Sequence, residues 1–238
     1  MSAATPTPSG EVSLAGLFDA SVRTAVSPIE AGLEDLLPAE REAVSRAVPK
    51  RQREFATARR VARRLLAELG RPPLAIPRNP DRTPAWPDGL VGSISHCDAL
   101  VAVVLAERGA IAGLGVDVEP DQPLEAVLWP RICTPREIDA IAATRDTDAG
   151  RGRAARLVFC AKEAFYKSVH PTLQRVLGFH EVEVAIDWER RRYEALLVGA
   201  RAGLPRGVRV DGRFAQRGGF SIAAATLWSG SPPTDGAP

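Results

Sequence analysis

The pattern of apolar and polar positions divides the chain into alternating helix-like and strand-like segments. Helical spacing runs over residues 33–69, with breaks near Pro38 and Pro49, and returns over 134–143 and 154–169. Apolar runs and two-residue alternation predict seven strands, over 91–95, 100–106, 111–119, 182–188, 193–198, 208–214 and 220–228. This mixture of elements predicts an α+β fold.

Three segments lack this patterning and are rich in Pro, Gly, Ser, Thr or charged residues. Residues 1–13 and 229–238 are expected to be disordered tails, and residues 144–153 are expected to form a mobile loop. The longest apolar run, 99–106, is much too short to span a membrane and is typical of a buried strand. We therefore expect no membrane association.

Composition narrows the class of protein only a little. Hydrophobic residues make up 45% and charged residues 25%, as in ordinary globular proteins, and the net charge of +2 does not argue for nucleic acid. The N-terminus has no basic region followed by an apolar stretch, so no export signal is evident. The three cysteines (Cys97, Cys133 and Cys160) lie far apart, and we expect reduced, buried thiols in a cytoplasmic protein.

Two carboxylates end the predicted strand over 111–119. Because side chains alternate along a strand, Asp117 and Glu119 project from the same face. Two acids on one side of an apolar strand suit a cation. The alternative is a strand that leaves the core and ends in two solvated acids before Pro120.

A second set of charges lies on the predicted helix over 154–169. Glu163 and Lys167 are four residues apart and share a helical face, and Lys162 lies beside them. An isolated pair of this kind is usually a surface salt bridge. Here the helix also carries three aromatic residues, which predict that it is largely buried: Phe159, Phe165 and Tyr166.

The long helix before residue 70 places arginines unusually. Its apolar stripe is predicted to comprise Phe55, Ala58, Ala62, Leu65, Leu66 and Leu69. Arg51 falls at the centre of this stripe and Arg59 at its edge. Each arginine either extends past the core to solvent or points into a cleft that holds an anion.

The segment over 78–97 joins these features. A basic loop that begins at Arg78 precedes a strand ending in Ser93, Ser95 and His96. A lone histidine near an apolar strand is often a satisfied core residue, but the neighbouring serines are suited to binding a polar ligand. The other two histidines, His170 and His180, have loop-like surroundings and receive no role.

Taken in order, these segments resemble the phosphopantetheinyl transferases of the surfactin- and enterobactin-synthetase type. The family motifs G-x-D-x-E and F-x-x-K-E-A-x-x-K correspond here to residues 115–119 and 159–167. An arginine-rich helix and a proline/tryptophan segment leading to a serine-histidine strand precede them. The resemblance covers roughly residues 50–180. Two departures are the arginines at some places where relatives carry lysine, and Val118, whose side chain cannot bind a metal.

The resemblance implies a transfer reaction. The enzyme is expected to move the 4′-phosphopantetheine group of coenzyme A to a serine of an acyl or peptidyl carrier protein, releasing 3′,5′-ADP, as a holo-[acyl-carrier-protein] synthase type transferase (EC 2.7.8.7). Asp117, Glu119 and Glu163 would hold Mg²⁺, which suits carboxylate and phosphate oxygens. Lys167 would add positive charge at the pyrophosphate, and Glu163 or a water molecule at the metal would accept the serine proton.

The resemblance also implies the coenzyme A site. Basic residues of the first helix, the loop and the strand would hold the 3′-phosphate: Arg51, Arg59, Arg78 and His96. Ser95, Lys162 and Lys167 would bind other parts of coenzyme A. Three further arginines before the catalytic helix are expected to border the docking surface for an acidic carrier protein: Arg151, Arg153 and Arg156. The alternative for these three is a solvated surface loop.

The family fold implies two similar α/β subdomains in a pseudo-twofold arrangement, here residues 14–112 and 113–228, with the active site between them and a monomeric state. Two other classes of protein remain open. A metal-dependent nuclease or phosphoesterase also needs clustered carboxylates and basic residues. An arginine-rich nucleic-acid-binding module needs interleaved aromatic residues, but only 5% of residues are aromatic, so we expect no nucleic-acid partner.

Overall fold

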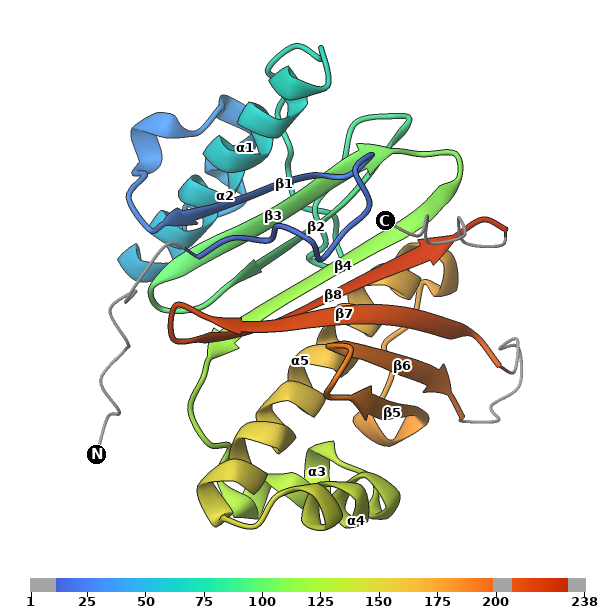
Figure 1. Cartoon of the computed structure of the whole chain (residues 1–238). Coiled ribbons are helices and arrows are strands. Elements are labelled where there is room, and N and C mark those ends of the chain that lie inside the picture. The colour runs from blue at the N-terminus through green and yellow to red at the C-terminus, as the bar shows by residue number, and fades with distance from the viewer. Residues whose placement is uncertain (1–11, 199–206, 231–238) are drawn as a thin grey trace.

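The computed structural model describes residues 12–198 and 207–230. Two antiparallel sheets form its framework (Figure 1). The smaller sheet has the order β1-β3-β2, with the bounds β1 Arg23–Pro28, β2 Leu90–His96 and β3 Leu100–Glu107. The larger sheet has the order β4-β8-β7-β6-β5, with the bounds β4 Ile111–Pro120, β5 Val182–Asp187, β6 Arg192–Leu197, β7 Arg209–Arg217 and β8 Phe220–Trp228.

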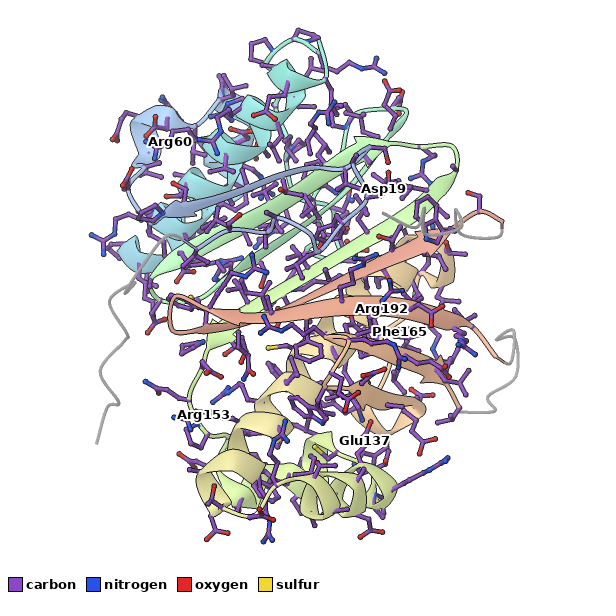
Figure 2. The ribbon with its side chains drawn as sticks, viewed as in Figure 1. Asp19, Arg60, Glu137, Arg153, Phe165 and Arg192 are labelled. Atoms are coloured by element: carbon purple, nitrogen blue, oxygen red, sulfur yellow. The ribbon has the colours of Figure 1, made fainter. Side chains whose placement is uncertain are left out.

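Helices cover these sheets. The first set precedes β2 and comprises η1 Leu33–Asp35, α1 Pro38–Glu42 and α2 Pro49–Glu68. The second set lies between β4 and β5 and comprises η2 Ala126–Leu128, α3 Trp129–Ile132, α4 Pro135–Thr144, α5 Asp148–Leu173 and η3 Phe179–Glu181. Helix α2 packs on the small sheet, and α5 crosses one face of the large sheet (Figure 1). Figure 2 labels the buried Phe165 of α5, which belongs to the apolar core between α5 and that sheet.

The predicted α+β class is therefore confirmed, and most predicted elements lie within a few residues of their observed bounds. The helix predicted over 33–69 is interrupted where prolines begin α1 and α2. The predicted stripe of α2 is buried, apart from Leu69, which is partly buried. The three cysteines are free and buried, as expected.

Three local predictions were wrong or incomplete. Strand β1 was not predicted, because its sequence RTAVSP has only two strongly apolar positions. The loop expected over 144–153 is shorter than predicted, because only residues 145–147 separate α4 from α5. Helix α5 begins at Asp148, where the Thr147 hydroxyl accepts a hydrogen bond from the Gly150 amide at 3.0 Å. His170 also lies in α5 rather than in a loop.

Glycine made the start of α5 look like a loop. A Cβ atom at Gly152 would lie 2.6 Å from the Cβ of Pro123, so the absence of a side chain permits this close contact. The predicted tails lie mainly outside the described residues. At their described edges, Val12 packs against a core cluster and the Ser229 amide donates to the Ala110 carbonyl at 2.8 Å.

Serine side chains join the two sheets. The Ser93 hydroxyl of β2 accepts a hydrogen bond from the Val116 amide of β4 at 3.1 Å, and the Ser95 hydroxyl accepts one from the Val118 amide at 3.2 Å. These serines satisfy amides of the strand at the edge of the large sheet. A shared apolar cluster surrounds this junction and includes Val91, Leu100, Val104, Val116 and Ile222.

Two glycines let α5 lie directly against β4. A Cβ atom at Gly113 would lie 2.0 Å from the Ser168 carbonyl oxygen, and one at Gly115 would lie 1.8 Å from the Ala164 carbonyl oxygen. Asp117 and Glu119 continue the same face of the strand. The close contact therefore aims the two carboxylates of β4 at α5. No helix within the described ranges combines the length and apolar character that a membrane span needs.

Candidate active site

Asp117 lies at the centre of the site. It is 4% exposed, and its Oδ1 accepts hydrogen bonds from the Ser95 hydroxyl at 2.8 Å and the Lys167 ammonium at 2.7 Å. Lys167 also donates to the Val116 carbonyl at 3.0 Å. The other carboxylate oxygen, Oδ2, is buried without a hydrogen-bond partner. A buried carboxylate oxygen without a partner is energetically unfavourable unless a cation or a donor reaches it.

The two other predicted metal ligands share this electrostatic environment. Burial, followed by the charge of Asp117, raises the pKa of Glu119 to about 7. Burial also raises the pKa of Glu163, with a further upward contribution from Asp117 that the ammonium of Lys167 opposes. Mutual repulsion between carboxylates of this kind is relieved when a cation binds among them.

Positive side chains already lie on two of these acids. Lys167 contacts Asp117, and the Arg156 guanidinium donates to Glu119 Oε2 at 3.3 Å. Among residues 12–198 and 207–230, no three Asp, Glu, His or Cys side chains converge closely enough to form a metal site. The donor set still fits a hard divalent cation, because it offers oxygen atoms, excess negative charge and the unpaired Oδ2 of Asp117.

Arg51 and His96 come together as predicted from their separate segments. The Arg51 guanidinium contacts the Nε2 atom of His96, and both side chains contact Glu54 Oε2, Arg51 at 3.2 Å and His96 Nδ1 at 3.5 Å. Burial and the charge of Arg51 lower the pKa of His96. Glu54 was not predicted, because its position three residues after Arg51 is indistinguishable from that of any surface glutamate.

Arg59 is more deeply buried than the sequence suggested. It is 4% exposed, its Nε donates to the Ile76 carbonyl at 2.6 Å, and its guanidinium lies 3.9 Å from the centroid of the Phe55 ring. Burial lowers its pKa to about 10, and the nearby charges of Arg51 and Arg78 contribute. Arg78 itself is exposed. Arg51 and Arg78 thus lie near enough to Arg59 for their charges to act on it, and Arg59 is deeply buried.

Lys162 does not join this group. It is 2% exposed, and its ammonium donates at 2.8 Å to three acceptors: Glu137 Oε2, the Ile132 carbonyl and the Phe179 carbonyl. Glu137 lies in α4, away from β4 (Figure 2). Since all three donors of the ammonium are satisfied within the core, the predicted contact of Lys162 with coenzyme A does not fit this structure.

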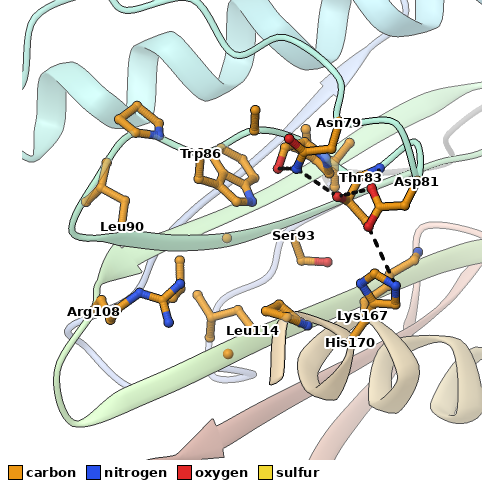
Figure 3. Close-up of a pocket in the computed structure, with 18 of the residues that line it drawn as sticks. Asn79, Asp81, Thr83, Trp86, Leu90, Ser93, Arg108, Leu114, Lys167 and His170 are labelled. Carbon is orange, nitrogen blue, oxygen red and sulfur yellow. Dashed lines mark hydrogen bonds and ion pairs between the residues drawn. The ribbon is translucent and has the colours of Figure 1, made fainter. Parts of the chain in front are cut away.

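A cavity of about 870 Å³ adjoins the site (Figure 3). Its walls come from the loop over 79–89, from β2 and from the facing ends of β4 and α5. Its lining includes both apolar and charged groups: Trp86, Leu90, Ser93, Leu114, Tyr166 and Lys167. Lys167 lines the cavity and contacts Asp117, so the cavity adjoins the carboxylates through this lysine. None of the three carboxylates lines the cavity itself.

Sequence reasoning missed one contact across this cavity. His170 Nε2 lies 3.8 Å from Asp81 Oδ2 of the loop, and the Tyr166 ring meets the His170 ring edge-on at 5.2 Å between centroids (Figure 3). The Thr83 hydroxyl and amide hold the pKa of Asp81 below its usual value. The helical spacing of Tyr166 and His170 was the one available signal for their pairing.

The three arginines expected to border the carrier protein all lie in α5, and their side chains contact different partners. Arg156 contacts Glu119, so it belongs to the site itself. Arg153 lies at the outer flank of α5 (Figure 2), where its Nε donates to the Asp121 carbonyl at 3.3 Å. Arg151 Nε donates to the Arg145 carbonyl at 2.9 Å.

Comparisons with known proteins identify the family of the chain. The family model of the 4′-phosphopantetheinyl transferase N-terminal domain matches residues 39–106, and that of the 4′-phosphopantetheinyl transferase superfamily matches residues 113–217. The second match contains all three candidate metal ligands and Lys167.

Curated relatives extend the similarity over most of the chain. The 4′-phosphopantetheinyl transferase Svp of Streptomyces mobaraensis is 37% identical over 81% of this chain and 78% of its own length. PptT of Mycobacterium tuberculosis is 33% identical over 80% and 86%, and Npt of Nocardia iowensis is 39% identical over 64% and 67%. The chain therefore belongs to the 4′-phosphopantetheinyl transferase superfamily.

Proposed function

We propose that the protein transfers the 4′-phosphopantetheine group of coenzyme A to a serine of an acyl or peptidyl carrier protein and releases 3′,5′-ADP. The observation that carries this proposal is the carboxylate of Asp117, which has one oxygen on Lys167 and one buried oxygen without a partner, beside a large cavity. Family membership supplies the reaction class, and the finer assignment as a holo-[acyl-carrier-protein] synthase type enzyme belongs to the proposal.

Mg²⁺ is the proposed cofactor. Asp117, Glu119 and Glu163 would hold it, because their oxygen donors and mutual repulsion suit a hard divalent cation. A cation held there would supply charge neutralisation for the pyrophosphate and the leaving 3′,5′-ADP.

Three further side chains are proposed to stabilise charge, accept the serine proton and orient Asp117. Lys167 holds a positive charge at the cavity wall, where it stabilises charge that develops on the phosphate oxygens. Glu163, or a water molecule at the metal, is the proposed acceptor of the serine proton. Ser95 orients Asp117 through its hydrogen bond to Oδ1.

The basic cluster is the proposed site for the 3′-phosphate of coenzyme A. Arg51, Arg59, Arg78 and His96 supply donors and positive charge there, and guanidinium groups match the geometry of phosphate. Lys162 is left out, because its ammonium is fully engaged by the core.

Arg151 and Arg153 are the proposed contacts for an acidic carrier protein. Arg156 is excluded from this role because it contacts Glu119. Reversing the charge of Arg151 and Arg153 is expected to raise the KM for the carrier protein and to weaken its salt dependence, while the KM for coenzyme A stays unchanged. An unchanged carrier KM at low ionic strength would place the docking surface elsewhere.

Intact-mass measurement tests the proposed activity. The protein is incubated with coenzyme A, Mg²⁺ and an apo carrier protein, and the carrier is expected to gain one phosphopantetheine group. A carrier in which alanine replaces the acceptor serine, and the enzyme variant Asp117→Asn, serve as controls and should show no gain. Hydrolysis of nucleic acid or of a simple phosphate ester without any carrier modification would contradict the proposal.

The division into subdomains over 14–112 and 113–228, the monomeric state and the cytoplasmic location remain predictions from the resemblance. The chain changes sheets between β3 and β4, which is the reason to retain the boundary near residue 112. Names of relatives such as enterobactin synthase component D favour a role in siderophore, peptide or polyketide synthesis.

A further inference from the structure

Arg51, Glu54 and His96 form a closed triad at the end of β2. Arg51 contacts His96 Nε2, while Arg51 and His96 Nδ1 both contact Glu54 Oε2. Glu54 is 6% exposed, and the side chain of His96 is 33% exposed. The triad thus combines a buried acid with two groups that remain reachable from solvent.

This geometry favours the neutral form of His96. A guanidinium only donates hydrogen bonds, so the Nε2 atom that faces Arg51 must accept and carries no proton. The remaining proton lies on Nδ1, which faces the Glu54 carboxylate. His96 is therefore neutral in this arrangement, in agreement with the direction of its pKa shift.

We infer that capture of the 3′-phosphate of coenzyme A is coupled to the uptake of one proton from solvent by His96 Nε2. In this step Arg51 releases Nε2 and turns to the phosphate, Nε2 gains the proton, and both ring nitrogens then donate. Nε2 donates to the phosphate and Nδ1 to Glu54, which acts as the positioning residue. No covalent bond other than the new N–H changes. The inference rests on the proposed function.

The charges around His96 explain why the ligand triggers this change. Arg51 and Lys167 disfavour the protonated ring, whereas Glu54 and Asp117 favour it. A phosphate dianion adds two negative charges and removes the contact with Arg51. An adjacent opposite charge raises a pKa by about 1–3 units, which is enough to protonate a histidine near neutral pH.

Isothermal titration calorimetry measures the proton directly. Coenzyme A and dephospho-coenzyme A, which lacks the 3′-phosphate, are each titrated into the full protein at pH 7.5 in two buffers of different ionisation enthalpy. We expect coenzyme A to take up about half a proton or more beyond dephospho-coenzyme A. Free phosphate monoester is almost fully ionised at this pH, so it releases few protons. A contribution from His170 at the cavity is common to both ligands and cancels.

A matched pair of variants assigns the proton. His96→Asn keeps a donor toward Glu54 but has no titratable ring, so it should abolish the difference in proton uptake. His180→Asn alters an exposed histidine and should leave the difference unchanged. Equal proton uptake with the two ligands in the wild-type protein, or an extra proton that survives in His96→Asn, would overturn the inference.

The pH dependence gives a second measurement. Since a bound proton is harder to supply at high pH, the preference for coenzyme A over dephospho-coenzyme A should fall as pH rises, by up to about tenfold per pH unit. A preference that is constant between pH 6.5 and 8.5 would contradict proton coupling but leave the transfer activity intact. Failure to bind coenzyme A at all would instead contradict the proposed function.

Discussion

The two lysines of α5 have opposite surroundings although they are close in sequence. Lys162 is enclosed by the core of the large sheet and its helices, where it joins α4, α3 and η3 through three hydrogen bonds. Lys167 lies on the opposite side of the helix, at the cavity, with its ammonium on Asp117. One charge therefore joins parts of the scaffold, and the other faces the cavity.

The difference arises because two faces of α5 have different surroundings, one in the core and one at the cavity. Five residues correspond to about 140° of rotation on a helix, so the two side chains point to different sides. The buried pair of Lys162 and Glu137 fixes α5 relative to α4. The face that carries Glu163 and Lys167 is only partly buried, and there Lys167 contacts Asp117 of β4.

The largest expected effect is on stability. Lys162→Met should lower the free energy of unfolding by about 3–5 kcal/mol, because it leaves the Glu137 carboxylate buried without its cation. Urea unfolding measures the loss. Lys50→Met, which breaks the exposed pair of Lys50 and Asp98, is the control and should change stability by less than about 1 kcal/mol. Equal losses for the two variants would show that the buried pair contributes no more than an exposed one.

The second effect concerns the turnover rate and the other lysine of α5, Lys167. Lys167→Met should lower kcat about 10²–10³-fold, because a group that stabilises developing charge is lost. The rate is measured from the formation of modified carrier protein at saturating coenzyme A. Lys50→Met, which removes an exposed lysine paired with Asp98, should leave kcat unchanged. A wild-type kcat in Lys167→Met would exclude Lys167 from the reaction.

Contact between α5 and β4 is the next feature to test. Gly115→Ala should destabilise the protein by about 1–3 kcal/mol, because the new Cβ atom would meet the Ala164 carbonyl oxygen at 1.8 Å. Gly109→Ala is the control, since nothing lies within 4 Å of its new Cβ atom, and it should change stability by less than about 0.5 kcal/mol. Thermal unfolding of both variants, together with kcat, shows whether the separation of strand and helix also disturbs the site.

The smallest expected effect is a pH dependence of stability. The pKa of Glu119 is about 7 in the folded protein and near 4.5 when the chain is unfolded, so the folded state binds more protons between these values. The metal-free protein should therefore lose stability as pH rises from about 4.5 to 7. Glu119→Gln should reduce this loss by about 1 kcal/mol, allowing for solvent screening. Urea unfolding with EDTA at pH 5 and 7.5 measures it, and Glu125→Gln, at an exposed site, should behave like the wild type.

Much of the fold followed from local pattern. The prolines that begin α1 and α2 and the apolar stripe of α2 are signals carried by neighbouring residues, and the structure bears them out. Strand β1 and the start of α5 carry weak local signals. The first is stabilised by pairing with β3, and the second by the close contact of Gly152 with Pro123, and both partners are distant in sequence.

In the candidate site, too, some features follow from the local sequence and others depend on partners that are distant in sequence. The sequence by itself identified Asp117, Glu119, Glu163, Lys167, Arg51 and His96, because their spacing matches the motifs of one family. Only the tertiary structure decided that Lys162 pairs with Glu137, that Arg156 lies on Glu119 and that Glu54 joins Arg51 to His96. Spacing fixes which face of an element a side chain occupies, whereas its partner depends on which distant segment packs against that face. That choice is made by the burial of apolar surface over the whole chain.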